Sequence, residues 1–299
     1  MACEDCRKKQ YSLAEKEIVE YIRNMGFNVQ ENAHLTGDNT SYDIYIPEKE
    51  VAFDYNGLYW HSTKIRPTTV GHRDRILNCA KTSNNIRLYY IWEDDYRDRK
   101  ELVLSFINEK LGVSDKENLN SNECFVTIEK SNSIELQDFI KNNDIKGFLS
   151  GSINLALREN NTREIVSAMI VNPLKSVNGL KIFRYCYSKI IYKGFEKLVD
   201  FLETYYNKDF IIINSDNDVS NGELYEETGF KPEKLIDPDY YYIVNNSRVH
   251  KFKYRKSYFK KTKGLIYKEG LTERELAELN GILRIYDSGK IQWIKYSNI

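Results

Sequence analysis

Proline and glycine are scarce in this chain, with 5 and 15 among its 299 residues. Their scarcity excludes a linker-like or disordered protein, because such chains are usually rich in both. Long apolar runs are missing too, and no stretch approaches the roughly 18 residues that a membrane-spanning helix needs. Net charge is also absent, since 44 basic residues balance 44 acidic ones. That balance by itself neither favours nor excludes a charged partner.

Cysteine is rare and odd in number, which favours reduced thiols over a disulfide framework. The five cysteines are Cys3, Cys6, Cys79, Cys124 and Cys186. Cys3 and Cys6 form a lone CxxC, and zinc binding is the alternative to a structureless start, although a zinc site needs about four ligands. The first ten residues carry charges where a secretory signal needs an apolar stretch. We therefore expect a cytoplasmic protein.

Periodicity over residues 1–112 predicts a compact α/β unit. Ser12 and Glu15 have the spacing of a capping box, and an apolar stripe with Ile18 and Ile22 follows them. The elements expected are a helix at 12–27, a hairpin of strands at 41–46 and 50–55 around a turn at 47–49, a helix at 71–83, a strand at 86–92 and a helix at 97–112. The strand at 86–92 follows a helix, so we expect it to be parallel to its neighbour.

The remainder of the chain predicts a second α/β unit and a small tail. Residues 113–123 are polar and lack periodicity, which indicates a linker. Residues 124–247 alternate strand and helix patterns, with residues 240–244 as the closing strand. Residues 248–299 add a basic stretch, a helix and a hairpin that turns at residues 287–289. The fold class expected is therefore α/β, with a mixed sheet flanked by helices in the first domain.

Two aspartates occupy the predicted hairpin. Side chains alternate along a strand, so Asp54 and Asn56 share one face, and the hairpin can bring Asp43 to the same sheet edge as Asp54. Two such carboxylates repel each other unless a positive charge lies between them. Oxygen ligands with open positions suit Mg²⁺, or Mn²⁺ in its place, which would neutralise charge as a phosphodiester breaks. The alternative is that each aspartate simply faces solvent.

These segments resemble a known family. The stretch DIYIP…FDYNGLYWH…HRDRI…IRLYYIWEDD looks like the very-short-patch-repair (Vsr) endonuclease fold of the PD-(D/E)xK superfamily. It is more specifically similar to the EDxHD homing endonucleases of phages, over about residues 10–110. The resemblance implies an active site of Glu15, Asp43, His61 and Asp74, with Asp43 as a metal ligand. Asp54 would be a second ligand or a neighbour of the metal, and the sequence leaves both open.

Asn56 departs from the superfamily pattern, and His61 and the acid of the helix each leave a choice. Asn56 stands where the superfamily core usually has lysine, and an amide supplies neither a cation nor a proton at neutral pH. His61 can take over proton transfer, because an ordinary histidine pKa lies near 6.5; the alternative is a histidine packed beside Tyr59 and Trp60. Glu17 competes with Glu15 as the acid of the helix, but only Glu15 shares a side with the apolar stripe.

The second unit resembles the GNAT acetyltransferase fold near its end, in the segments YKGFEKLVDFLE and LYEETGF. A working acetyltransferase needs several backbone amides around glycines to cradle a pyrophosphate. The segment YSKIIYKGF at that place has Gly194 alone. We therefore interpret the unit as a degenerate GNAT-like domain that contacts or positions DNA.

The stretch RVHKFKYRKSYFKKTK, residues 248–263, has eight Lys or Arg residues and no acid. Aromatic residues alternate with these cations, a combination that suits phosphates and stacked bases. The alternative is a solvated charged strand. The predicted DNA contacts are Lys251, Lys253, Arg255, Lys256, Lys260 and Lys261.

The function predicted from these patterns is metal-dependent hydrolysis of double-stranded DNA by a homing endonuclease. It would act as a monomer or a dimer in the cytoplasm of a bacterial host. Two alternatives stay open. One is an inactive nuclease fold that binds or regulates DNA, which Asn56 favours. The other is an acetyltransferase with a nucleic-acid-binding front end.

Overall fold

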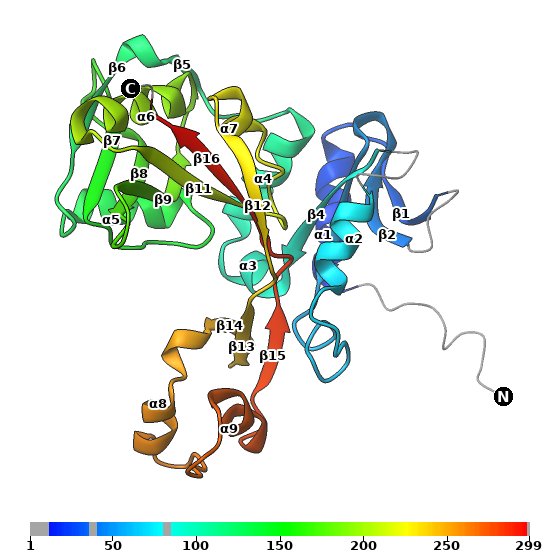
Figure 1. Ribbon diagram of the computed structural model, residues 1–299. Helices are drawn as coiled ribbons and strands as arrows, with labels where there is room; N and C mark the ends of the chain where they lie inside the picture. The colour runs from blue at the N-terminus through cyan, green and yellow to red at the C-terminus, as the bar shows by residue number, and fades with distance from the viewer. Residues whose placement is uncertain (1–11, 36–40, 80–84, 298–299) are drawn as a thin grey trace. The chain divides into compact units, whose positions relative to one another are not determined.

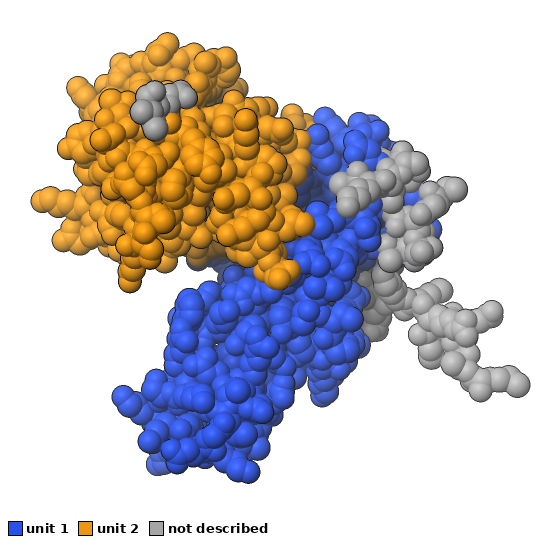
Figure 2. Space-filling view, in the orientation of Figure 1, with its two compact units in different colours: residues 1–100, 238–288 blue, residues 101–237, 289–299 orange. Residues whose placement is uncertain are grey.

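The computed structural model describes residues 12–35, 41–79 and 85–297 (Figure 1). Contacts between Cα atoms divide the chain into two compact units, each made of two chain segments (Figure 2). Unit 1 comprises residues 1–100 and 238–288, and unit 2 comprises residues 101–237 and 289–299. The domain boundaries drawn from the sequence stay predictions.

A four-stranded mixed sheet forms the first part of unit 1, in the order β1-β2-β3-β4. The elements of this part are α1 (Leu13–Asn24), β1 (Gln30–His34), β2 (Ser41–Ile46), η2 (Pro47–Lys49), β3 (Val51–Asn56), α2 (Gly71–Cys79), β4 (Arg87–Trp92) and α3 (Glu93–Asp98). Strands β2 and β3 are antiparallel, and β3 and β4 are parallel. The predicted hairpin and the predicted parallel strand are therefore confirmed, whereas β1 was not predicted.

Helix α1 begins at the predicted capping box. The Ser12 hydroxyl accepts a hydrogen bond from the Glu15 N–H, and the Glu15 carboxylate accepts one from the Ser12 N–H. The stripe side chains Ile18, Val19 and Ile22 are buried, and burying each such side chain is worth roughly 1.5–3 kcal/mol. The helix and its boundary are confirmed.

Residues 238–288 add a three-stranded antiparallel sheet to unit 1, in the order β14-β13-β15. The elements are β13 (Tyr240–Val244), β14 (Ser247–His250), η4 (Lys251–Lys253), α8 (Lys256–Lys261), α9 (Glu273–Leu279) and β15 (Leu283–Tyr286). Tyr242, Phe259 and Leu276 share one buried cluster, so both short helices pack on this sheet. Strand β13 was expected to close the sheet of the second α/β unit, and it pairs with β14 and β15 instead.

A seven-stranded sheet forms unit 2, in the order β12-β16-β11-β9-β8-β7-β6, and β10 and β5 form a separate parallel pair. The elements are α4 (Lys100–Leu111), β5 (Asn118–Asn120), η3 (Ser121–Glu123), β6 (Cys124–Ile128), α5 (Ile134–Asn143), β7 (Ile153–Glu159), β8 (Ile165–Pro173), β9 (Gly179–Tyr187), β10 (Ile190–Tyr192), α6 (Gly194–Tyr206), β11 (Phe210–Asp216), α7 (Glu223–Glu227), β12 (Lys231–Ile236) and β16 (Lys290–Tyr296). The segment expected as a linker thus contains β5 and η3.

The two faces of this sheet pack on different helices, because alternate side chains of a strand point to opposite faces. Leu155 and Leu157 of β7 share a cluster with Leu198 of α6. Ala156, between them, packs in another cluster with Leu136 of α5. Helices α5 and α6 therefore cover opposite faces, and the strands between them are apolar on both sides.

The predicted hairpin at residues 287–289 is wrong. Strand β15 pairs with β13, whereas β16 pairs with β11 and β12, so the two strands join different sheets. A short turn suits a hairpin and a change of sheet equally well, so the local sequence does not separate them. The α/β class is confirmed. No helix within the described ranges is long and apolar enough to cross a membrane.

Candidate functional site

The two aspartates of the β2–β3 hairpin lie together, as predicted. The strand register ends at Ile44 and Phe53, and beyond it each carboxylate accepts a backbone hydrogen bond from the other strand. Asp54 accepts from the Asp43 N–H at 3.1 Å, and Asp43 accepts from the Tyr55 N–H at 3.0 Å. The carboxylates therefore extend the ladder with side chains in place of backbone carbonyls.

The positive charge beside this pair comes from Arg75 of α2. Its guanidinium donates to the Asp54 carboxylate at 2.9 Å and to the Ser41 carbonyl at 2.7 Å. Burial raises the pKa of the Asp54 carboxyl to about 6; the nearby Asp43 adds to the rise and Arg75 opposes it. No group of three or more His, Cys, Asp or Glu side chains that could hold a metal ion occurs among the residues that the structure describes.

His61 contacts a second histidine. Its Nδ1 lies 2.7 Å from Nε2 of His72, and the two rings stack with centroids 4.9 Å apart. Nδ1 of His72 lies 3.1 Å from the Tyr286 carbonyl oxygen, which can only accept a hydrogen bond. A neutral His72 therefore carries its proton on Nδ1, and His61 donates from Nδ1 to it.

Glu15 and Asp74 have other partners. Glu15 caps its own helix through Ser12, and Asp74 forms an ion pair with Arg73 at 3.2 Å with about half of its side chain exposed. Glu17, the competing acid of α1, accepts hydrogen bonds from Tyr96 and Lys100. Of the predicted catalytic residues, the structure therefore brings Asp43 and Asp54 together. Whether any of these residues contacts a substrate stays a prediction.

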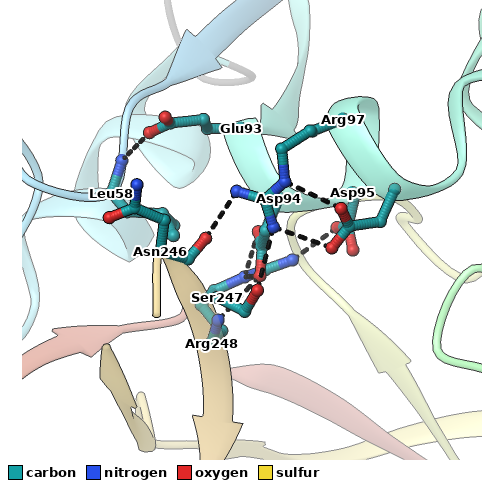
Figure 3. Close-up of polar contacts among 9 residues, drawn as sticks. Leu58, Glu93, Asp94, Asp95, Arg97, Asn246, Ser247 and Arg248 are labelled. Atoms are coloured by element: carbon teal, nitrogen blue, oxygen red, sulfur yellow. Dashed lines mark hydrogen bonds and ion pairs between the residues drawn. The ribbon is translucent and has the colours of Figure 1, made fainter. Parts of the chain in front are cut away.

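The basic stretch of residues 248–263 contains no acid, but acidic residues elsewhere in unit 1 pair with some of its cations. Arg248 pairs with Asp94 at 2.8 Å and with Asp95 at 2.5 Å (Figure 3). Its guanidinium also packs over the Trp92 ring. Arg97 of α3 donates to the Asn246 carbonyl and the Ser247 hydroxyl in the same cluster (Figure 3). These contacts join α3 to β14 within unit 1.

Two of the predicted DNA-contacting cations are also paired. Lys251 contacts Asp239 at 2.5 Å, and Arg255 lies 3.8 Å from Glu273 and stacks over Phe252. The other four, Lys253, Lys256, Lys260 and Lys261, are exposed. Acids from outside residues 248–263 therefore pair with Arg248, Lys251 and Arg255 and neutralise part of the charge of the stretch.

Strands β9 and β11 of unit 2 separate towards their carboxyl ends. Their parallel register ends at the pair Ile182 and Ile213, although β9 continues to Tyr187 and β11 to Asp216. Over that stretch β9 keeps β8 as its other neighbour, and β11 keeps β16. The register of β8 and β9 skips Phe183, so a bulge lies where the separation begins.

A cavity of about 260 Å³ lies where the two strands separate. Its lining residues come from β9, β11, α4, α7 and the segment after α5, all within unit 2. Ligands of α/β sheets characteristically bind beyond the carboxyl ends of parallel strands, where neighbouring strands diverge. The cavity therefore has the position of a ligand site.

Titratable side chains line this cavity. Lys146 contacts Asp216, which also contacts Lys290. The Lys146 side chain as a whole is 37% exposed. Its ammonium group is nevertheless surrounded by protein atoms that displace water from it. This burial, together with the charges of Lys290 and Arg184, lowers the pKa of Lys146 to about 7.

A second group of side chains lies across the same cavity. The Tyr187 hydroxyl contacts Glu109 of α4, which pairs with Lys116 at 3.1 Å. Burial raises the pKa of Tyr225, on α7, to about 12. Gly222 starts α7 with φ of +86°, and a Cβ there would overlap the Trp293 ring. That close approach fixes where α7 begins and so where Tyr225 is placed.

Sequence reasoning missed these cavity residues. It identified the strands β9 and β11 and the helix α6 between them, but the end of their ladder depends on the bulge at Phe183 and leaves no periodic pattern. The available signal was topological. A strand, a helix and a parallel strand form a unit whose ligands lie at the carboxyl ends of the strands, here near Tyr187 and Asp216.

Comparison with known proteins gives neighbours in structure only. No protein-family model matches the chain, and no curated protein matches it in sequence. An acetyltransferase from Bacillus subtilis, solved in complex with CoA, is 14% identical, with a TM-score of 0.34 over 58% of this chain and 98% of its own. The aminoglycoside 6'-N-acetyltransferase from Enterococcus faecium is 11% identical, with the same score and coverage. The ribosomal-protein-S18-alanine N-acetyltransferase from Escherichia coli is 12% identical, with a TM-score of 0.34 over 59% of this chain and 95% of its own.

The predicted Vsr-like homing endonuclease is contradicted. The structures that the chain resembles are acetyltransferases rather than nucleases. The predicted Mg²⁺ or Mn²⁺ is contradicted as well, since Arg75 supplies the charge beside Asp54 and the described residues hold no metal-binding group. The predicted double-stranded DNA partner is contradicted with the nuclease, and acids outside the basic stretch already neutralise part of it.

Proposed function

We propose that unit 2 binds an acyl thioester of CoA in the cavity between β9 and β11 and transfers the acyl group to an amine. The observation that carries this proposal is the early end of the β9–β11 ladder, which leaves a cavity at the carboxyl ends of two parallel strands. A ligand arm with amide groups can lie along such strand edges through main-chain hydrogen bonds, as an added strand does. At about 260 Å³ the cavity suits a narrow arm rather than a whole nucleotide.

Tyr225 can serve the chemistry of this transfer. When an amine attacks a thioester carbonyl, negative charge develops on the oxygen and the departing thiolate needs a proton. Tyr225 lines the cavity, and a pKa of about 12 keeps its phenol protonated at neutral pH. The phenol can therefore donate a hydrogen bond to the reacting group and a proton to the sulfur.

The structural neighbours indicate which ligand to test first. The Bacillus subtilis structure contains CoA, and the other two are named as N-acetyltransferases. At identities of 14% or less these likenesses do not assign an activity. The support for the proposal is the cavity and the residues that line it.

The segment between β9 and α6 offers few groups that could bind a phosphate. Residues Ile190–Tyr192 pair with β5, and Lys189 is held by Glu117 and Glu159. Helix α6 begins at Gly194 without a side-chain cap, so its first backbone amides are the donors that a phosphate would meet. The binding energy must therefore come chiefly from the arm inside the cavity.

Calorimetry with acetyl-CoA and the full-length protein tests the proposal. Val219→Trp places an indole into the cavity and should abolish binding, whereas Val177→Trp, at an exposed position outside the cavity, should leave binding unchanged. Turnover is then measured with a panel of small amines as acceptors. Absence of acetyl-CoA binding by the folded wild-type protein would refute the proposal.

We also expect a cytoplasmic location. Three cysteines, Cys79, Cys124 and Cys186, are buried free thiols, which is typical of proteins in a reducing compartment. Cys3 and Cys6 lie outside the described residues. Fractionation of the producing cell tests the expectation.

A further inference from the structure

The segment between α5 and β7 positions one lysine at the cavity. The Asp144 carboxylate accepts a hydrogen bond from the Lys146 N–H at 2.7 Å, and Asp144 also lies 3.7 Å from the Arg184 guanidinium of β9. These contacts hold the backbone of Lys146 next to the strand that forms one wall. The Lys146 side chain lines the cavity and reaches Asp216 on the opposite wall.

The charges around Lys146 favour an amine that gives up its proton. Asp216 contacts two ammonium groups, those of Lys146 and Lys290, so one carboxylate serves two cations. Arg184 adds a third positive charge nearby, and the Asp218 and Asp144 carboxylates oppose these cations only in part, so that with burial the pKa of Lys146 is lowered. A pKa near 7 leaves a substantial fraction of Lys146 neutral at physiological pH, whereas ordinary lysines titrate near 10.4.

We infer that Lys146 is itself an acyl acceptor, modified by a thioester bound in the cavity between β9 and β11. This inference rests on the proposed function. The neutral Nζ attacks the thioester carbonyl, the N–C bond forms and the C–S bond breaks. The nitrogen loses one proton and the departing sulfur takes one up, so the products are an amide on Lys146 and a free thiol.

The modified protein keeps its charges paired. An acylated Lys146 is neutral, and Asp216 retains its contact with Lys290. Loss of the Lys146 charge therefore leaves no carboxylate buried alone, which would otherwise cost several kcal/mol. It also removes one of the cations that crowd this end of the cavity.

Peptide mapping by mass spectrometry tests the inference on the full-length protein. The protein is incubated with acetyl-CoA, and separately with the small thioester S-acetyl-N-acetylcysteamine. Lys141 of α5 is the internal reference, because its side chain is 52% exposed and lies outside the cavity. Lys146 should be acetylated roughly tenfold or more faster than Lys141, because Lys146 lines the cavity that holds the thioester and Lys141 lies outside it.

Two variants and the binding measurement separate the outcomes. Lys146→Arg should remove the dominant adduct, and Lys141→Arg should leave it in place. Acetylation of Lys146 no faster than Lys141 with both donors would overturn the inference, and calorimetric binding of acetyl-CoA in that case would leave the proposed function standing. Selective modification of Lys146 by the small thioester without acetyl-CoA binding would show a reactive amine, and it would refute both the proposed function and the inference that rests on it.

Discussion

The Asp43–Asp54 pair of unit 1 and the cavity of unit 2 both gather titratable side chains, but they use them differently. At the pair, the Asp54 carboxylate accepts from a backbone N–H and from Arg75, and its side chain is only 10% exposed. In unit 2, Lys146 and Tyr225 line a cavity of about 260 Å³. Titratable side chains that gather in a fold can therefore serve either an internal hydrogen-bond network or a ligand site. A cavity beside them distinguishes the ligand site from the network.

Removing the Asp54 carboxylate should have the largest effect on stability. Asp54→Ala leaves the Arg75 guanidinium without its acid, and breaking a buried pair costs about 3–5 kcal/mol. Urea unfolding measures the loss. Asp74→Ala is the matched control, because Asp74 is about half exposed and its pair with Arg73 should contribute at most about 1 kcal/mol. If both substitutions lowered the free energy of unfolding by equally small amounts, Asp54 would not be part of a buried ion pair.

Removing the Tyr225 hydroxyl should have the next largest effect, and on catalysis rather than stability. Tyr225→Phe keeps the ring in the cavity and removes the proton donor, which should lower the rate of acyl transfer by about 10²-fold. Binding of acetyl-CoA should change little. Tyr205→Phe, on the exposed surface of α6, is the control. An unchanged rate in Tyr225→Phe would mean that another group protonates the sulfur.

The pH dependence of stability should distinguish the buried pair further. The folded pKa of Asp54, about 6, is raised above its ordinary value of 3.8. Between these values the folded state holds a proton that the unfolded state has released, so this group contributes stability that is lost as pH rises from about 4 to about 6. Asp54→Asn should abolish that contribution, worth roughly 1–3 kcal/mol, in unfolding curves recorded at pH 4 and pH 7. A difference between the two proteins that stays constant over this range would contradict the raised pKa.

Phosphates should have the smallest effect on binding. Because β10 is paired with β5 and Lys189 is held by two glutamates, acetyl-CoA and acetyl-pantetheine should bind within about threefold of each other, or roughly 0.65 kcal/mol. Competition calorimetry at one ionic strength measures the ratio. A preference of a hundredfold for acetyl-CoA would reveal a phosphate site at the start of α6.

Local patterns in the sequence predicted much of the fold. The capping box of α1, the β2–β3 hairpin, the parallel β4 and the span of α6 from Gly194 to Tyr206 all follow from periodicity and end signals that act within one element. The pairing partners of β13 and β16 could not be predicted in this way, because the side-chain pattern of either strand is compatible with several neighbouring strands. Pairing across long chain separations depends on the whole fold.

The site was harder to predict than the fold. Asp43 and Asp54 were correctly expected to lie together, but the cation beside them came from Arg75, 21 residues beyond Asp54 on another element. Lys146 showed no motif at all, and its pKa is lowered chiefly by burial and then by the charges of Lys290 and Arg184, which the fold brings near. Such contacts and pKa shifts depend on residues that are distant in the sequence and that only the fold brings together.

The position of β16 between β11 and β12 has a consequence for synthesis of the chain. Strands β11 and β12 leave the ribosome first, but β16 follows only after residues 237–289, most of which belong to unit 1. At elongation rates of about 5–20 residues per second, the two strands wait for roughly 3–10 seconds with unpaired edges. Exposed edges are sites where nascent chains pair with one another. Slowed elongation over residues 237–289 should therefore reduce the yield of folded protein more than slowed elongation before residue 210.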